Sequence, residues 1–579
     1  MRSLILFLTL VAAPLHADTL DTVIEDYWSY YLAEFPLAAT RAGLKSGNDR
    51  LARVDPNSQA RRLQAERAFL DRLSLLDAED WDNNDRINAE LLQWILEDSI
   101  GAYELDLSRI PFNTFSGFFM AALSTSSGVA MTEVSDYEDY IARLNDIPRY
   151  FDENLANMRR GMRDGFVLPQ IVIDGVLPTI RAQLKERAED SRFFTPFEAI
   201  NNRIPAGDQE SIRARGRQAI ESSVMPAFAA VAEFLANEYA ASETLGAEML
   251  PDGEAFYAHQ IRRYTTLTGI SSDEIHAIGL AEVARIRAEM AALIERVEFD
   301  GEFRDFIQFM RTDPRFYATS AEQLLMATAW TAKRIDHVMP GYFKTLPRQS
   351  YGVVPVPDEI APNYTTGAYR SAPPGGSKGG EYWVNTFALD QRPLYEIPAL
   401  TLHEAVPGHH HQSALSLEIP GAPEFRKSLY FSAFGEGWAL YAEFLGEEMG
   451  IYRDDYERFG RLSYEMWRAS RLVIDTGLHA KGWSREQAQA FLADNTSLSE
   501  GNIRAEVDRY ISWPGQALSY KLGEIKIREL RAYAEETLGN RFDIREFHDA
   551  LLVNGAMPLA MLERQILRFV ERELDSPDS

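Results

Sequence analysis

Apolar residues recur at three- and four-residue steps along most of the chain, with charged residues between them. This spacing places the apolar side chains on one face of a helix. It is clearest in four segments, 137–161, 212–241, 272–297 and 322–338. Capping side chains precede an acidic first turn in 271–274 and in 319–322, as is typical of helix starts. The pattern predicts a mainly α protein built from many helices.

The helical pattern is interrupted between residues 346 and 380, where proline and glycine accumulate. Directly after this loop, segment 381–387 is β-branched and aromatic and is the best strand candidate in the chain. It predicts either a small structural hairpin or short sheet, or an edge strand that pairs with an extended peptide. In the second case, a substrate would contact Tyr382, Val384 and Asn385.

Length and turn chemistry suggest how the chain is divided. Its 579 residues, 46% of them hydrophobic, are enough for two or more lobes. Residues 1–17 have a basic start, an apolar stretch and a small residue at the end, which predicts a cleaved secretory signal. Turn residues at 250–253 suggest a boundary between an N-terminal helical lobe, 18–250, and a catalytic helical lobe, 251–579.

Charge and cysteine content narrow the partners and the location. The formal net charge is −28, and such a surface repels nucleic acid and anionic lipid. The apolar N-terminal stretch is too short to span a membrane stably, so no membrane insertion is expected. The chain has no cysteine, which excludes disulfides and a lipid attached to cysteine. We therefore expect a soluble protein that is periplasmic or secreted. The sequence does not indicate its oligomeric state.

Candidate metal chemistry is concentrated in residues 403–411, which hold four of the ten histidines. Imidazole nitrogens suit zinc, and a glutamate beside a zinc-binding histidine activates water in known hydrolases. Here Glu404 follows His403 directly. The alternative is a surface tract that scavenges metal ions. The carboxylate and the apolar segment 397–402 before it favour a catalytic metal site.

The spacing of the histidines requires a deformed helix. On a regular helix, His403 and His409 would differ by about 240° in direction and about 9 Å in height, which would aim their rings apart. Pro407 lacks an N–H, and its ring collides with the carbonyl of His403. Gly408 tolerates unusual backbone angles. We expect a bulged turn that makes His409 the second ligand, with His410 as the alternative.

A third ligand is needed, because two histidines leave zinc under-ligated. The nearest downstream candidate is Glu436, which lies between two glycines that allow close approach. Glu443, two helical turns further on, is suited to orient a ligating histidine through its second ring nitrogen. The residues therefore predict a zinc site with one position left for water.

Four motifs in this order carry a resemblance to a known family: 403–412, 436–443, 475–483 and 514–523. They resemble the bacterial domain-of-unknown-function family numbered 885, over nearly all of the chain after residue 17. That family is similar to the mostly helical zinc peptidases that include thimet oligopeptidase, angiotensin-converting enzyme and the thermostable carboxypeptidases. The resemblance implies a multi-helix, clam-like metallopeptidase fold with a deep cleft. It also implies a general base and three zinc ligands, namely Glu404 with His403, His409 and Glu436.

Further site residues follow from the late motifs. Related helical peptidases place a tyrosine beside the developing oxyanion, so the resemblance implies this role for Tyr520. The alternative is a packed aromatic side chain. Lys521 and His410 would contact the substrate. His479 would donate a hydrogen bond at the cleft, unless it is a structural histidine.

Four cations are candidates either for internal salt bridges or for contact with the substrate. Arg468 and Arg471, one helical turn apart, are more typical of internal salt bridges. Arg370 and Lys378, in the loop rich in glycine and proline, are cations in an acidic protein and would receive a peptide C-terminus. Flexible loops also carry solvated charges by default.

The leading functional prediction is zinc-dependent hydrolysis of peptide bonds, with short peptides as substrates and Glu404 as general base. The expected enzyme is an oligopeptidase or carboxypeptidase. One alternative is a non-catalytic, metal-dependent binding protein, although a structural zinc site would need no base. The other is a zinc hydrolase that acts on a different amide or ester.

Overall fold

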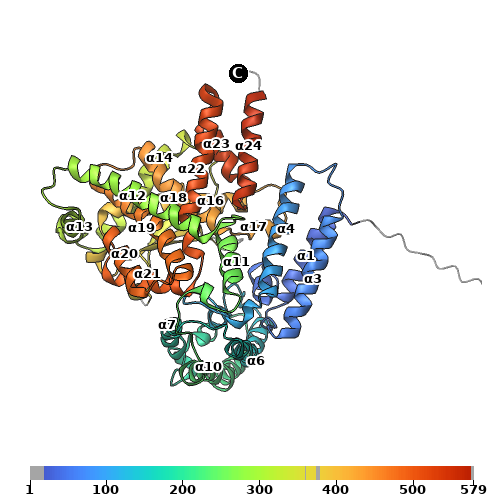
Figure 1. The fold of residues 1–579 in the computed structure, drawn as a ribbon. Helices are drawn as coiled ribbons and strands as arrows, with labels where there is room; N and C mark the ends of the chain where they lie inside the picture. Colours follow the sequence, from blue (N-terminus) through green and yellow to red (C-terminus); the bar gives the residue numbers. More distant parts are fainter. Residues whose placement is uncertain (1–17, 359, 373–377, 576–579) are drawn as a thin grey trace, which may run out of the picture.

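The computed structural model describes residues 18–358, 360–372 and 378–575, most of which lie in α-helices (Figure 1). The predicted mainly α class is confirmed. The predicted secretory signal, residues 1–17, lies outside the described residues.

The helices fall into two series separated by a small sheet. Those before the sheet are α1 (Leu20–Glu34), α2 (Pro36–Arg41), α3 (Pro56–Ser74), α4 (Asn83–Glu104), α5 (Phe118–Leu123), α6 (Val134–Asp164), α7 (Gln170–Arg181), α8 (Thr195–Glu198), α9 (Ala206–Ala219), α10 (Met225–Asn237), α11 (Gly253–Thr265), α12 (Ser272–Arg296), α13 (Phe303–Thr312) and α14 (Ala321–Val338). Those after it are α15 (Ile397–Glu404), α16 (His409–Leu417), α17 (Glu424–Lys427), α18 (Ser432–Glu448), α19 (Asp455–Ala480), α20 (Arg485–Asn495), α21 (Glu500–Ser512), α22 (Ser519–Leu538), α23 (Ile544–Leu552) and α24 (Leu559–Asp575).

The helix signals in the sequence correspond closely to these elements. Helices α6, α12 and α14 begin and end within three residues of the predicted segments. The side chain of Ser271 caps α12 by accepting from the Glu274 N–H, and Ser320 caps α14 in the same way through Gln323. Segment 212–241 is not one regular helix, because a π turn, η4 (Ile220–Val224), separates α9 from α10.

The stretch 206–237 is, among the described residues, the one helical stretch whose length and composition would allow it to cross a membrane. Half of its most apolar window is buried inside the protein. Buried side chains such as Ile212, Val224 and Phe228 pack into a hydrophobic core with α6 and α7. A core helix of a globular protein passes the same test of length and composition, and this packing is what such a helix shows.

Two large hydrophobic cores hold the helices together. One joins α1 and α4 near the start of the chain to α15, α18, α22 and α24 near its end. The other joins α6, α7 and α10 to α19, α20 and α21. In Figure 1 the first helices, α1, α3 and α4, form one side of the molecule, while α23 and α24 project together from another. Both cores draw residues from each side of the turn at 250–253, where the sequence predicts a lobe boundary.

A three-stranded sheet lies between the two helical series. Its strands are β1 (Tyr351–Pro355), β2 (Gly367–Arg370) and β3 (Gly380–Val384), in the spatial order β1-β3-β2. Strand β3 pairs in parallel with β1 and antiparallel with β2. The predicted strand is therefore central rather than an edge, and both of its sides are already paired. The segment expected to be a loop holds two of the strands, apart from residues 373–377, which lie outside the described part of the chain.

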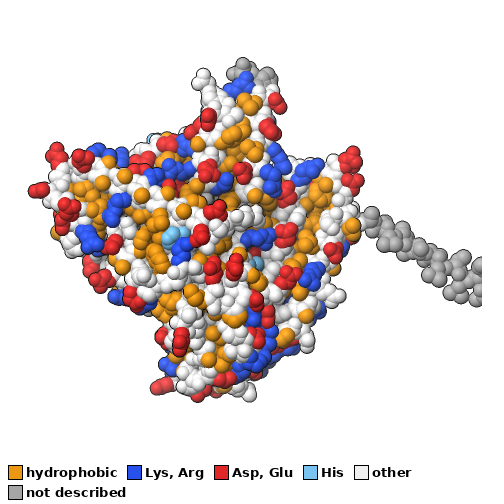
Figure 2. Space-filling model, viewed as in Figure 1, with side chains coloured by type: hydrophobic (Ala, Val, Ile, Leu, Met, Phe, Trp, Pro, Cys, Tyr) orange, Lys and Arg blue, Asp and Glu red, His pale blue; other side chains and the backbone are white. Residues whose placement is uncertain are grey.

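On the face shown in Figure 2, Asp and Glu side chains are interspersed with Lys and Arg instead of gathering in a single patch. No single acidic patch on this face therefore accounts for the net charge of −28.

Candidate metal centre

The helix is interrupted where Pro407 and Gly408 predict it. Helix α15 ends at Glu404 and α16 begins at His409, with a turn between them. The Pro407 carbonyl accepts a hydrogen bond of 2.7 Å from Trp438 Nε1, which holds the turn against α18. A Cβ on Gly408 would lie 1.9 Å from the carbonyl oxygen of His403. Glycine is required here because the turn lies directly on the end of α15, rather than for a positive φ.

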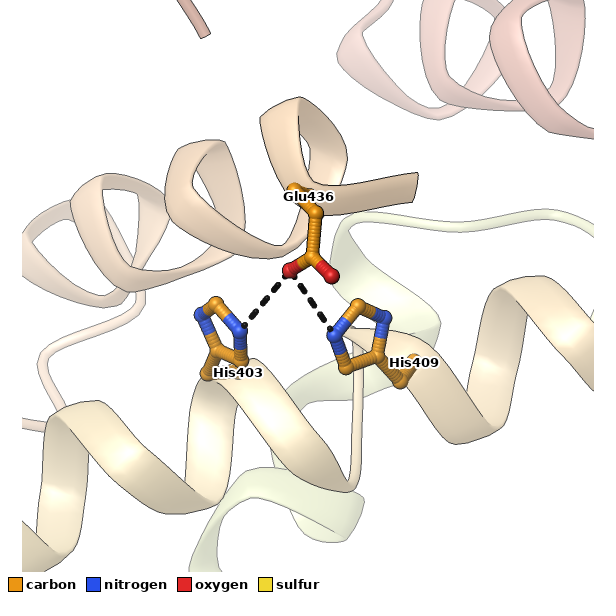
Figure 3. Close-up of side chains that lie close together, drawn as sticks. All are labelled: His403, His409 and Glu436. Carbon is orange, nitrogen blue, oxygen red and sulfur yellow. Dashed lines mark ion pairs between the residues drawn. The ribbon is translucent and has the colours of Figure 1, made fainter. Parts of the chain in front are cut away.

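This turn brings His403 and His409 to the same carboxylate (Figure 3). The Nε2 atoms of His403 and His409 lie 3.6 Å and 3.4 Å from Oε2 of Glu436, which comes from α18. The three ligand atoms lie within 4.8 Å of one another. The two imidazole rings are perpendicular, with centroids 4.8 Å apart. Two imidazoles and one carboxylate form the donor set of catalytic zinc sites, so these residues fit that ion.

Neighbouring side chains orient the three residues. His403 Nδ1 lies 2.8 Å from Oε1 of Glu443, so its Nε2 is left facing Glu436. The hydroxyl of Tyr430 donates to Oε1 of Glu436 at 2.9 Å. A Cβ on Gly437 would lie 2.5 Å from the backbone of Gly523, so the glycine after Glu436 allows α18 to cross α22 closely.

The electrostatics of the cluster favour a cation. Burial by itself would lower the pKa of His403, but hydrogen bonds to Glu436 and Glu443 raise it to about 10. Burial would raise the pKa of Glu436, but the charges of His409 and His403 hold it well below its ordinary value. The carboxylates thus stabilise positive charge at the point where the imidazoles meet.

Glu404 lies beside the cluster and is 9% exposed. Its Oε2 accepts a hydrogen bond of 2.8 Å from the backbone N–H of Tyr369 in β2. This contact fixes the orientation of the carboxylate. The other oxygen, Oε1, makes no hydrogen bond to the backbone of β2. Glu404 is therefore positioned as an acceptor next to the metal-binding residues.

A cavity of about 410 Å³ is lined by the side chains of His403, Glu404, His409, Tyr430 and Glu436. One wall is strand β2, represented by Gly367, Ala368 and Tyr369, and the other walls come from α15, α16, α18, α19, α21 and α22. Tyr520 lines the cavity, and its hydroxyl accepts a long hydrogen bond of 3.4 Å from Arg509. The cavity thus contains the predicted base, the three predicted ligands and the predicted oxyanion donor.

His410 does not join the cluster. Its Nδ1 lies 3.2 Å from the Tyr369 hydroxyl and its Nε2 lies 3.0 Å from the carbonyl oxygen of Gln349. Burial lowers its pKa to about 4, so the ring is neutral. Of the two histidines left open by the sequence, His409 is the one that faces Glu436. His410 is buried outside the cavity lining, so the structure does not bring this predicted substrate contact together with the predicted catalytic residues of the cavity.

His479 is also placed away from the cavity. It is 1% exposed, and its Nδ1 accepts from the N–H of Ala247 at 3.2 Å. Its Nε2 lies 3.0 Å from the carbonyl oxygen of Tyr510, so both nitrogens bond to backbone. This placement is that of the structural histidine which the sequence left as the alternative, because both nitrogens bond to backbone and the residue does not line the cavity.

Lys521 is completely buried in an ion-pair network. Its ammonium group lies 2.7 Å from Glu465, 2.8 Å from Glu524 and 2.9 Å from Glu282. Burial would lower its pKa, but these carboxylates raise it above the ordinary value. The structure does not place Lys521, predicted to contact the substrate, in the cavity lining; its ion pairs join α22 to α12 and α19.

The predicted contacts on β3 also serve the fold. Tyr382 and Val384 are buried in a hydrophobic core. The side chain of Asn385 donates to the carbonyls of Ala361, Tyr364 and Thr365 and holds the loop before β2. These three residues do not line the cavity. The structure therefore does not bring these predicted substrate contacts to the cavity, and β3 is the central strand of the sheet.

Sequence reasoning missed several residues of the cavity. Tyr430 and Tyr369 were not singled out, although Tyr430 precedes Glu436 by six residues. Arg509 was also missed, and for Arg468 and Arg471 an internal salt bridge was preferred to contact with the substrate. These residues come from segments that are far apart in the chain. Their spacing in the sequence therefore does not indicate that they line one cavity.

The chain belongs to the family described as "Bacterial protein of unknown function (DUF885)", whose model matches residues 36–566. No curated protein matches it. The expected family is thereby confirmed, and the match includes every residue of the candidate metal centre.

Two solved structures are similar over nearly the whole chain. One is a candidate lipoprotein from Colwellia psychrerythraea, with 28% identity and a TM-score of 0.88, covering 96% of this chain and 99% of that one. The other is a candidate lipoprotein of unknown function from Shewanella oneidensis, with 18% identity and a TM-score of 0.74, covering 95% and 100%. The second likeness concerns the fold alone.

Proposed function

We propose that this protein is a zinc-dependent hydrolase that cleaves peptide bonds of short peptides. The observation that carries the proposal is the convergence of His403, His409 and Glu436 within 4.8 Å, in a cavity that also holds Glu404. A structural zinc site closes its fourth position with another protein ligand, whereas this set has three. A carboxylate next to an open metal position is the arrangement used by metal-dependent hydrolases.

When bound, zinc would polarise the scissile carbonyl and make a water molecule more acidic. The protein's own residues supply the rest. Glu404 takes a proton from the water molecule while the oxygen of that water bonds to the carbonyl carbon. Glu404 then gives a proton to the leaving amine as the C–N bond breaks. The Tyr520 hydroxyl is suited to donate to the developing oxyanion. Water is thus added across the bond and no other reactant is consumed.

Strand β2 offers a place for the substrate backbone. It is an edge strand, and its residues 367–369 line the cavity. The N–H of Tyr369 points away from β3, since it donates to Glu404. An extended peptide that lies along this edge would have its carbonyl groups beside the metal-binding residues. A clam-like arrangement with a deep cleft, and kinship with the helical zinc peptidases, are part of this proposal.

The test compares wild-type protein with a Glu404→Gln variant on a mixed peptide library, read by mass spectrometry. We expect the variant to lose at least about 100-fold in cleavage, the scale of general-base catalysis, with its zinc content unchanged. A Glu418→Gln variant, altered at a glutamate that pairs with Arg348 outside the cavity, serves as the matched control. Equal cleavage by Glu404→Gln and wild type would remove Glu404 from the mechanism.

We also propose a location in the cell envelope. The support is the signal-like N-terminal sequence together with the similar structure of the candidate lipoprotein from Colwellia psychrerythraea. This chain has no cysteine for a lipid to be attached to, so we favour a periplasmic or secreted form. Fractionation of cells followed by sequencing of the mature N-terminus tests this, with residue 18 expected to be the first.

A further inference from the structure

A group of three arginines forms part of the wall of the metal-site cavity. Arg468 and Arg471 come from α19, and Arg509 comes from α21. Arg468 is 5% exposed and Arg471 is 2% exposed. Buried charges are normally paired with opposite charges or used to bind a ligand. Three cations at one cavity are therefore unexpected in a chain with a net charge of −28.

The carboxylates near these arginines do not balance them. Glu506 is shared, since it lies 2.9 Å from Arg471 Nη2 and 3.6 Å from Arg509 Nη1. The carboxylate paired with Arg468 is Glu443, at 3.8 Å, and it already bonds His403 at 2.8 Å. Among the described residues, three guanidinium groups are thus paired with two carboxylates, one of which serves the metal centre.

The three guanidinium groups also have hydrogen-bond donors to spare. Arg468 Nε, Arg471 Nη1 and Arg509 Nε are buried and have no hydrogen-bond partner within the described part of the chain. Buried donors in proteins are nearly always satisfied. Unpaired buried donors also occur at arginines away from the cavity, such as Arg143 and Arg426, so the excess of cations at the cavity is the observation that points to a ligand.

Aromatic rings hold the arginines in place. The Arg471 guanidinium lies 4.4 Å from the centre of the Tyr520 ring and 4.5 Å from that of Trp467. The Arg468 guanidinium lies 4.5 Å from the same Trp467 ring. Stacking of this kind restricts the guanidinium planes and prepares them for a planar partner.

We propose that Arg468, Arg471 and Arg509 bind a carboxylate of the substrate, namely the C-terminal carboxylate of a short peptide. This rests on the proposed function and deepens it, because it makes the enzyme one that cleaves near peptide C-termini. A carboxylate offers two coplanar oxygens, which match the paired donors of a guanidinium. The cavity of about 410 Å³ contains both the arginines and the metal-binding residues, so one bound peptide reaches both.

The first experiment measures binding of three peptides to the zinc-loaded Glu404→Gln protein by calorimetry. The first has neutral side chains and a free C-terminus, the second is the same peptide with a C-terminal amide, and the third is the amide with a terminal aspartate side chain. We expect the free acid to bind at least about 30-fold more tightly than the amide, because the amide lacks the charge that makes a buried, charge-assisted contact. Tight binding of the aspartyl amide would support a carboxylate site but assign it to acidic side chains. Equal binding of all three overturns the proposal.

The second experiment uses an Arg468→Gln variant of the otherwise wild-type, zinc-loaded enzyme. We expect KM for the free-acid peptide to rise about 30-fold while kcat changes little and the zinc content is retained. Arg458→Gln is the matched control, since Arg458 lies on the same helix, is paired with Glu447 and does not line the cavity. An unchanged preference for the free acid in Arg468→Gln would remove this arginine from the site. The comparison of peptides on the Glu404→Gln protein stands even where Arg468→Gln does not fold.

The two proposals fail in different ways. Cleavage of the peptide library that is the same in wild type and Glu404→Gln would reject the proposed hydrolase. Zinc-dependent cleavage with no preference between free acid and amide would keep the hydrolase and reject the arginine site.

Discussion

At the residue scale, the contact between Glu443 and His403 explains how one imidazole is prepared for a metal. The carboxylate lies 2.8 Å from Nδ1, which fixes the ring and leaves Nε2 for the ligand position. The other oxygen of Glu443 is buried and, among the described residues, has no hydrogen-bond partner. The role of Glu443 is therefore electrostatic and orientational rather than direct ligation.

Replacing Glu443 by glutamine tests this role. We expect the affinity for zinc to fall about 10- to 100-fold, because outer partners of ligating histidines typically contribute that much. The measurement is a competition titration against a zinc chelator of known affinity. Glu448→Gln, on the same helix but paired with Arg531 at the surface, is the control. An unaltered zinc affinity in Glu443→Gln would show that His403 is oriented by other contacts.

The residues of the candidate centre differ in how far the sequence could predict them. His403, Glu404 and His409 lie in one short segment, so their types and spacing identify them directly. Glu436 follows from the need for a third ligand. His479 stands alone in the sequence, without neighbouring ligands that would indicate its role. Its two hydrogen-bond partners are backbone groups, and such partners cannot be identified from residue types.

At the element scale, the turn between α15 and α16 decides whether the ligands meet. Two residues more than in a regular HExxH helix are accommodated because Gly408 lies against the carbonyls at the end of α15. Pro407 predicts the break, and Gly408 is predicted to tolerate its unusual backbone angles. The structure adds a second reason for the glycine, because a Cβ at this position would collide with the carbonyl oxygen of His403.

A Gly408→Ala variant measures the importance of this close contact. The added Cβ would lie 1.9 Å from the His403 carbonyl oxygen, so the turn has to shift. We expect a loss of about 1–3 kcal/mol in the free energy of unfolding, as for other overpacked sites, together with weaker zinc binding. Gly207→Ala is the control, since nothing lies within 4 Å of the Cβ it would add. Denaturant unfolding that is the same for both variants would disprove this account of the turn.

The sheet shows the limit of strand prediction. Composition located β3 correctly, but β1 and β2 have only five and four residues and lie in a segment rich in proline and glycine. Strand order depends on which segments pair, and that information is not local. The substrate contacts were therefore assigned to β3, whereas the edge strand at the cavity is β2.

At the scale of the whole molecule, buried charges connect distant parts of the chain. Asp475 in α19 is completely buried, accepts a hydrogen bond of 2.6 Å from the Tyr257 hydroxyl and also accepts from the Gly515 N–H. Burial raises the pKa of Asp475 to about 7 from an ordinary value of 3.8. The folded protein therefore holds a proton that the unfolded chain releases between those two values.

This shift sets the sign of a pH effect on stability. As pH rises from about 4 to about 7, Asp475 lowers the free energy of unfolding by up to about 4 kcal/mol, and the loss is complete above pH 7. An Asp475→Asn variant cannot lose the proton, so its stability relative to wild type should improve over this range. Urea unfolding at pH 5 and pH 7.5 measures the difference, with Asp300→Asn as an exposed control. Parallel pH dependences for wild type and Asp475→Asn would refute the buried-carboxyl account.

The central claim is that His403, His409 and Glu436 hold one zinc ion. Elemental analysis of dialysed, zinc-loaded protein by mass spectrometry tests it most directly. We predict about one zinc per chain in wild type and in His410→Gln, whose histidine faces Gln349 and Tyr369, and almost none in His409→Ala. Wild-type protein without stoichiometric zinc, or a His409→Ala variant that retains it, would contradict the assignment.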